Sequence, residues 1–249
     1  RDGTFADASV TSGIAREYGP ALGVSTADFN GDGWMDIYVA NDGKENQLWL
    51  NKKDGTFENV ALLSGVALPV TGKAEASMGV DAGDFDDDGD EDLFMTELTS
   101  QGSNLYVNDG SAVFDDRSTP SGVGPASVPF TGFGTGWFDY DNDGRLDLLS
   151  VNGTVQIIES LRQAKDPLPL HQRKLLFHNL GGGRFLPDGR IETNRRRPGL
   201  LDIPRDARPV PEILSDIACH VPLKVVGSRI EPATPMACAS GVSGRTLPR

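Results

Sequence analysis

The chain of 249 residues is long enough for one or two domains, and 38% hydrophobic with 24% charged residues supports a folded core. Its net charge of −13 argues against nucleic acid or an anionic membrane as the main partner. No apolar run approaches the roughly 18 residues of a transmembrane helix, so we expect no membrane insertion. Because the chain starts at Arg1 without a signal-like apolar stretch, we interpret it as a piece of a longer protein.

Composition divides the chain near residue 189. Residues 1–150 hold 27 acidic and 8 basic side chains, and all 18 aromatic residues lie at or before Phe185. Residues 190–249 contain no aromatic residue but 9 Arg and 8 Pro, a composition that builds a core poorly. We predict a domain over residues 1–189 and a Pro/Arg-rich tail over residues 190–249 that is disordered or is translated from a shifted reading frame. A genuine Pro-rich linker is the alternative, and reading the gene in its other two frames separates the two.

The first domain is a repeat with a period of about 55 residues. Acidic segments begin at Asp28, Asp84 and Asp139, and each is followed by two short apolar runs, a glycine turn and a phenylalanine. The apolar runs are Ile37–Ala40 with Leu48–Asn51, Leu93–Thr96 with Leu105–Asn108, and Leu148–Val151 with Leu175–Asn179. About four strand-like runs in each period are typical of a propeller blade. We therefore predict an all-β fold, a partial (open) β-propeller of about three four-stranded blades plus partial blades, followed by an irregular C-terminal tail.

Several residues outside the acidic segments are given structural roles. Between Asn152 and Arg173 the third period carries an insertion, in which residues 157–165 are expected to form a short helix. The lone histidines His171 and His178 are expected at the surface. Seven aromatic residues are expected in the core: Phe29, Phe85 and Tyr140 inside the acidic segments, and Phe5, Phe57, Phe114 and Phe185 after the glycine turns.

Each acidic segment places oxygen-bearing side chains at positions 1, 3, 5 and 9, a glycine at position 6, and a backbone carbonyl at position 7. In the first loop these positions are Asp28, Asn30, Asp32 and Asp36, with the carbonyl of Trp34. In the second loop they are Asp84, Asp86, Asp88 and Asp92, with Asp90 at position 7. In the third loop they are Asp139, Asp141, Asp143 and Asp147, with Arg145 at position 7.

Carboxylates this close together repel one another unless a cation lies among them, and hard oxygen ligands in a flexible loop suit Ca²⁺. No His or Cys is near in sequence, which disfavours zinc and copper. An EF-hand is excluded because it needs Glu at position 12, where this chain has Val39, Met95 and Ser150. Solvated turns are the plain alternative, but three loops in register make it improbable. We expect about three Ca²⁺ ions, with the first loop weakest because it carries Asn30.

The pattern Gly…Asp-Phe-Asp-x-Asp-Gly-x-x-Asp-Leu resembles the FG-GAP (VCBS) repeats of integrin α-like propellers. The residues around Asn152-Gly153 and from Gln172 to Phe185 resemble the family of cartilage acidic protein and its bacterial ASPIC/UnbV-type relatives. The likeness covers residues 1–189 and implies a propeller of roughly seven blades, usually exported, with Ca²⁺ in the blade loops. It also implies that the twelve side chains given above are the ligands. The chain departs from the family after about residue 186, where a further acidic loop would follow, so the remaining blades of the parent propeller are missing.

Residues 1–170 contain no His and residues 1–218 no Cys, which leaves no Ser-His-Asp or Cys-His nucleophile in the repeats. Of the 27 acidic residues before position 150, 14 lie inside the three loops, and off-loop acids such as Glu75, Asp81 and Glu97 are not singled out. We therefore expect an extracellular binding and adhesion scaffold for a protein or glycan ligand, secreted or located in the periplasm or at the cell surface, and not an enzyme. The alternative is the propeller domain of a polysaccharide-active, lyase-like enzyme.

Overall fold

The computed structural model describes residues 3–187, 223–226 and 229–232, which belong to two compact units. In the second unit, the described residues form the antiparallel hairpin of β13 (Leu223–Val226) and β14 (Arg229–Pro232). The predicted boundary near residue 189 and most of the predicted tail lie outside the described residues and stay predictions. Everything that follows concerns the first unit.

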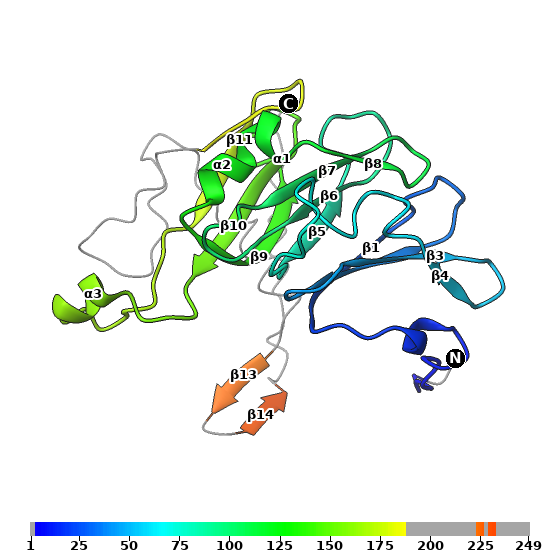
Figure 1. Ribbon diagram of the computed structural model, residues 1–249, viewed down its shortest axis with the longest axis horizontal. Helices are drawn as coiled ribbons and strands as arrows, with labels where there is room; N and C mark the ends of the chain where they lie inside the picture. Colours follow the sequence, from blue (N-terminus) through cyan, green and yellow to red (C-terminus); the bar gives the residue numbers. More distant parts are fainter. Residues whose placement is uncertain (1–2, 188–222, 227–228, 233–249) are drawn as a thin grey trace, which may run out of the picture. The chain divides into compact units, whose positions relative to one another are not determined.

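Three four-stranded antiparallel sheets follow one another along the first unit, and in each the strand order is the chain order (Figure 1). The first sheet contains β1 (Ala21–Ala27), β2 (Asp36–Asn41), β3 (Gln47–Asn51) and β4 (Phe57–Asn59). The second contains β5 (Val80–Gly83), β6 (Asp92–Met95), β7 (Asn104–Asn108) and β8 (Phe114–Asp116). The third contains β9 (Thr131–Phe138), β10 (Asp147–Gly153), β11 (Leu175–Asn179) and β12 (Phe185–Pro187). These open sheets confirm the predicted mostly β fold of partial propeller blades.

The core is divided into two layers, one on each side of the second sheet. All four residues of β6 are buried, because Leu93 and Met95 pack toward the first sheet while Phe94 packs toward the third. Side chains alternate between the two faces of a strand, so a strand covered on both faces must be apolar throughout. This explains why the central apolar run is continuous in the sequence.

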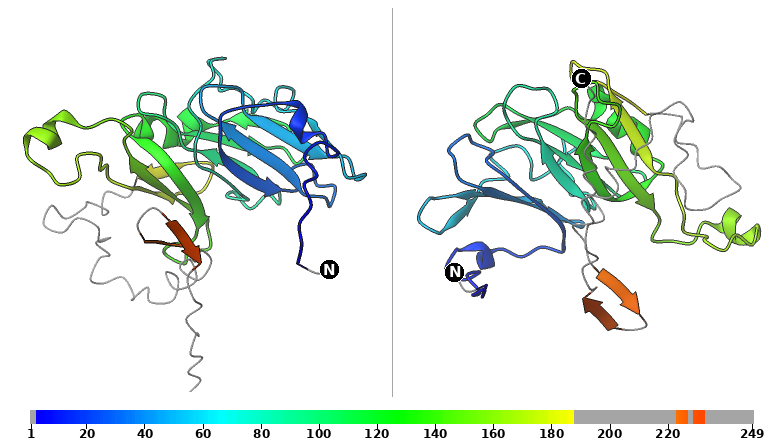
Figure 2. Two further views of the ribbon diagram at one scale, coloured as in Figure 1. Left: turned by 90° about the horizontal axis from the view of Figure 1, so that it is seen from below. Right: turned by 180° about the vertical axis from the view of Figure 1, so that it is seen from behind.

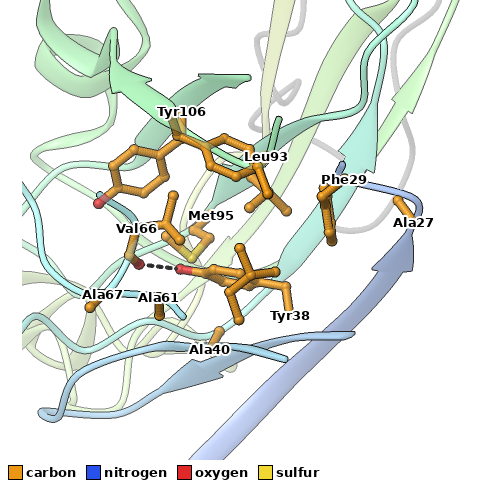
Figure 3. Close-up of a cluster of buried hydrophobic side chains, with 13 residues drawn as sticks. Ala27, Phe29, Tyr38, Ala40, Ala61, Val66, Ala67, Leu93, Met95 and Tyr106 are labelled. Carbon is orange, nitrogen blue, oxygen red and sulfur yellow. Dashed lines mark hydrogen bonds between the residues drawn. The ribbon is translucent and has the colours of Figure 1, made fainter. Parts of the chain in front are cut away.

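The first core layer joins the first and second sheets through aromatic side chains (Figure 3). Phe29 and Phe114 make an edge-to-face contact with ring centroids 5.9 Å apart. Tyr38 is fully buried and its hydroxyl donates a hydrogen bond of 2.8 Å to the carbonyl of Val66 (Figure 3). Burying the phenol is tolerated because its polar end has a partner.

The second core layer joins the second and third sheets around Trp137. The indole stacks on Phe85 at 5.6 Å with an interplanar angle of 7°, and Phe185 lies against both rings. The predicted core positions of Phe85, Phe114, Phe185 and Phe29 are confirmed, whereas Phe57 and Tyr140 are only partly buried.

The prediction for Phe5 is wrong, since its side chain is fully exposed. Residues 3–8 form no strand, so the copy of the glycine-phenylalanine element at the start of the chain has no sheet on which to pack. In the first sheet, Leu22 and Val24 of β1 are also exposed, whereas the second sheet is covered by core residues on both faces.

A Ser-Gly turn precedes each sheet, and the sequence analysis did not recognise it. It comprises Ser12-Gly13, Ser64-Gly65 and Ser121-Gly122, and the glycines have φ of +88°, +79° and +90°. The N–H of Phe57 donates to the carbonyl of Ser12 at 2.9 Å, and that of Phe114 to Ser64 at 3.0 Å. Each of these two turns therefore holds the start of the outer strand of the sheet that follows it. Only glycine adopts this backbone conformation without steric cost.

The helices are short and lie in the connections. They are η1 (Ile14–Arg16), α1 (Ser118–Ser121), α2 (Val123–Ser127) and α3 (Glu159–Gln163). α3 confirms the helix expected in the insertion, which projects away from the third sheet (Figures 1 and 2). Among the described residues, no helix has the length and apolar character needed to cross a bilayer.

Asparagine side chains link neighbouring sheets at the end of the third strand. The side-chain amide of Asn108 donates to the carbonyl of Phe29 at 2.9 Å, and that of Asn179 donates to the carbonyl of Phe85 at 2.9 Å. Both asparagines are buried. The equivalent Asn51 of the first sheet bonds only within its own sheet, to the carbonyl of Met35 at 3.1 Å. The same residue therefore has an inter-sheet role in two of the three repeats.

Replacing Asn179 with alanine should lower the free energy of unfolding by about 1–3 kcal/mol, because the buried carbonyl of Phe85 loses a donor. Asn51→Ala is the matched control, since Asn51 makes the same bond inside its sheet without the inter-sheet bond. Urea denaturation followed by circular dichroism measures both losses. Equal losses in the two variants would mean that the inter-sheet bond contributes nothing.

A buried carboxyl group, Glu97, lies in a polar network between the first and second sheets. Glu97 is 1% exposed, and its Oε1 accepts hydrogen bonds from the hydroxyl of Ser77 at 2.8 Å and the amide of Asn104 at 3.4 Å. Asn104 also donates to Glu75 at 3.1 Å. Burial, reinforced by the charge of Glu75, raises the pKa of Glu97 to about 8. Glu97 is therefore protonated at neutral pH in the folded chain.

This pKa predicts that Glu97 makes stability fall as pH rises from about 4.5 to about 8, by about 1.4 kcal/mol per pH unit. Over that range the unfolded chain releases the proton and the folded chain keeps it. Glu97→Gln cannot ionise and should remove this slope, so its advantage over the parent chain should grow up to pH 8 and then stay constant. Urea denaturation across pH in chelator measures the difference.

Glu58→Gln is the control for this pH dependence. Glu58 is exposed, and its bond to Lys52 lowers its pKa, so its effect has the opposite direction. A Glu97→Gln chain whose stability changes with pH as the parent's does would contradict the assignment.

Candidate metal centres

The three acidic loops lie at equivalent places, between the first and second strands of each sheet. Position 1 directly follows the first strand of each sheet, which is β1, β5 or β9. Position 9 (Asp36, Asp92 and Asp147) is the first residue of β2, β6 and β10. The glycines at position 6 have φ of +84°, +96° and +88°, as predicted for so tight a loop.

Position 4 of each loop also has a positive φ, which the sequence analysis did not recognise. Its residues are Gly31 with φ of +66°, and Asp87 and Asn142 with φ of +61°. Glycine, asparagine and aspartate are the residues that adopt this region most readily. That residue choice, recurring at one position in three repeats, was a signal that could have been found.

The position 1 carboxylate closes each loop. Its two oxygens accept the N–H groups of positions 5 and 6, at 2.9 and 2.6 Å for Asp28, 3.1 and 3.0 Å for Asp84, and 3.1 and 2.9 Å for Asp139. The side chains of positions 3 and 5 are held along the same turn. The loop backbone is therefore folded around the first ligand candidate.

The position 9 carboxylate is fully buried and joins the loop to the third strand. One oxygen accepts the N–H of position 2, at 3.1 Å for Asp36, 3.4 Å for Asp92 and 3.2 Å for Asp147. The other accepts the N–H of Asn51, Asn108 or Asn179, at 2.8, 2.9 and 2.7 Å. These asparagines, which the sequence analysis assigned no role, thus position the ninth ligand candidate.

In the second loop and in the third, three carboxylates of the same loop have oxygens within 4.8 Å of one another. One group is Asp84, Asp86 and Asp92, and another is Asp139, Asp141 and Asp143. In the first loop, position 3 is the amide Asn30, whose oxygen accepts the N–H of Asp32 at 3.2 Å. The oxygen donors fit a hard divalent cation such as Ca²⁺ in chemistry and spacing. The carbonyls of position 7 stay predicted ligands.

Burial and the repulsion between neighbouring carboxylates disfavour the ionised acids of the second loop. Burial raises the pKa of Asp92 to about 8, and the neighbouring charge of Asp86 adds to the shift. Burial, together with Asp88 and Asp84, also raises the pKa of Asp86. A bound cation would favour the ionised forms and reverse these shifts.

Basic side chains distinguish the three loops. The ammonium of Lys53 lies 3.3 Å from Asp32 in the first loop, and the guanidinium of Arg145 lies 2.8 Å from Asp143 in the third. The second loop contains seven acidic residues, and no ion pair to it is found in the described part of the chain. The second loop therefore has the strongest negative field.

His178 was expected at the surface, but it is half-buried beside the third loop. Its side chain is 28% exposed, and its Nδ1 lies 3.3 Å from Asp147 Oδ1 and 3.5 Å from Asp141 Oδ2. His178 lies 31 positions after Asp147, the last residue of the loop, and the two meet because β10 pairs with β11. Nitrogen is thus present beside the third loop, contrary to the sequence-based reason for disfavouring zinc.

The off-loop acids Glu75, Asp81 and Glu97 all accept hydrogen bonds, and only that of Asp81 joins two sheets. Asp81 Oδ2 accepts the N–H of Trp137 at 3.0 Å, which joins β5 to β9. Glu75 and Glu97 share Asn104, as described above.

Comparison with known proteins agrees with this geometry. The family model of the FG-GAP-like repeat matches residues 28–95 and 84–150, so each match begins at an acidic loop and extends to or past the next one. Human cartilage acidic protein 1 is 27% identical over 187 residues, 72% of this chain, and the Xenopus tropicalis protein is 31% identical over 160 residues, 61% of this chain. The chain spans about a quarter of the length of these relatives. Residues 28–150 are therefore FG-GAP-like repeats, and the chain is a distant homologue of cartilage acidic protein 1.

Proposed function

We propose that this chain is a calcium-stabilised propeller module that acts outside the cell as a scaffold for binding a protein or glycan partner. The observation that carries the proposal is the recurrence of one oxygen set in three loops, each closed by a fully buried carboxylate at position 9. A buried carboxylate is costly unless its charge is compensated. Ca²⁺ would supply that compensation and fix the loops at one end of the blades.

In the bound state, the side chains at positions 1, 3, 5 and 9 of each loop would hold the ion. The ion would contribute electrostatic stabilisation and no reaction chemistry. Extracellular calcium modules typically bind with Kd of about 10⁻⁴–10⁻³ M, which suits loops that keep their ligands partly exposed. The distant homology to cartilage acidic protein 1 supports an extracellular setting.

A binding role is preferred over catalysis because of how the acidic residues are used. The loop acids accept backbone N–H groups of the turns, Asp81 accepts an N–H from the neighbouring sheet, and Glu75 and Glu97 accept the side-chain amide of Asn104. A glycosidase-type mechanism would need two carboxyl groups facing one substrate cleft. The loops between strands are therefore the surfaces on which we place a partner.

A calorimetric Ca²⁺ titration of the full chain, with thermal melts in calcium and in chelator, tests this proposal. About three ions should bind. At ten times Kd each site adds about 1.4 kcal/mol of stability, so three sites should raise Tm on the order of 10 °C. Asp84→Asn should remove one ion, with Asp54→Asn as the control in an exposed turn outside the loops. No bound calcium and no shift in Tm would refute the calcium scaffold.

The first loop should be the weakest site, because it has Asn30 in place of an aspartate and Lys53 beside Asp32. Removing the ammonium in Lys53→Ala should strengthen calcium binding at that loop by up to about fivefold at low salt, the range of an exposed ion pair. The control is Lys52→Ala, which removes a neighbouring lysine paired with Glu58 instead. Site affinities come from loop-specific NMR shifts during titration. Equal effects of the two lysines, or tightest binding at the first loop, would contradict the assignment.

A further inference from the structure

The position of His178 distinguishes the third blade from the other two. His178 directly precedes Asn179 on β11, where the equivalent strands carry Leu50 and Val107. The fold therefore accepts an apolar side chain at this position. Blade packing alone does not explain why a histidine occupies it.

The imidazole is directed into the loop. Nδ1 is buried from solvent and has no hydrogen-bond partner in the described part of the chain, although carboxylate oxygens of Asp147 and Asp141 lie 3.3 and 3.5 Å away. The ring of Tyr140 contacts the imidazole edge-to-face, with centroids 5.9 Å apart and an interplanar angle of 82°. In this position of the ring, Nδ1 faces the two acids.

The three ligand atoms of Asp141, Asp147 and His178 lie within 4.8 Å of one another, so a single ion can touch all of them. Two carboxylates and one imidazole are the donor set of a borderline transition-metal ion, whose bonds to these atoms are about 2.0–2.2 Å long. Ca²⁺ takes oxygen ligands and gains little from the nitrogen. The second loop, with Val107 at the equivalent position, offers oxygen alone.

We propose that the third blade contains a transition-metal site made of Asp141, Asp147 and His178, which binds a borderline dication of the Zn²⁺ class. The site rests on the proposed function in that it uses a loop otherwise assigned to Ca²⁺. Because Asp141 and Asp147 belong to both ligand sets, zinc and calcium compete at this blade and only at this blade. The module then responds to two metals, with calcium in all three loops or with zinc in the third.

Calorimetric titration of Zn²⁺ into the full chain, with and without saturating Ca²⁺, tests the site. His178→Val introduces the residue that the second blade carries, and it should remove one zinc site or weaken it by about 100-fold or more. Even outer-shell partners of a metal ligand are worth about 10–100-fold. Calcium binding at the first and second loops should not change. A thermal melt in calcium confirms that the variant is folded.

His171→Ala is the matched control, because His171 is an exposed histidine 3.6 Å from Asp166 that contacts none of the three loops. It should leave zinc binding intact. Cys219, His220 and Cys238 are present in every variant, so any zinc that they bind cancels in the comparison.

Three outcomes are distinguishable. Zinc binding that is unchanged in His178→Val would overturn the inference. A tighter third calcium site in His178→Val without any loss of zinc would also overturn it, since the imidazole would then act as an internal cation. Loss of zinc in His178→Val from a chain that binds no calcium would support the inference while refuting the calcium scaffold.

Discussion

The structure of each blade depends on the buried aspartate at position 9 of its loop, whose carboxylate is not solvated. Asp36, Asp92 and Asp147 each accept one N–H from the loop and one from the third strand, so a single carboxylate connects three elements of the sheet. Two backbone donors compensate only part of the cost of desolvation, as the raised pKa of Asp92 shows. The same residue therefore organises the strands and anchors the loop in which we propose that a cation binds.

Neighbouring blades are joined by apolar contacts and by asparagine hydrogen bonds that recur at equivalent positions of the repeats. The second sheet buries apolar side chains on both faces, whereas the first leaves Leu22 and Val24 exposed. Asn108 and Asn179 add a hydrogen bond between sheets at the loop end, beside the aromatic core. Stability in such an array comes from interfaces between adjacent repeats as much as from each repeat alone.

One loop design is placed in three electrostatic environments. The first loop has an amide at position 3 and a lysine at its edge, and the second has acidic side chains throughout. The third has Arg145 beside Asp143 and an imidazole beside Asp147. The loop backbones are alike, so the differences in metal affinity and selectivity that we propose between the blades rest on a few side chains around them.

The sequence by itself determined the blades, the loops and the short helix of the insertion, because these depend on local patterns. A loop closed by hydrogen bonds within nine residues, with glycine at a positive φ, can be predicted without knowledge of the rest of the fold. Only the tertiary structure decided that His178 lies beside Asp147, that Asn179 bridges to Phe85, and that Phe5 is exposed. These three positions depend on strand register, on the pairing of strands across a long insertion and on which faces of a sheet are covered. Side chains far apart in sequence meet only after the chain has adopted this tertiary arrangement.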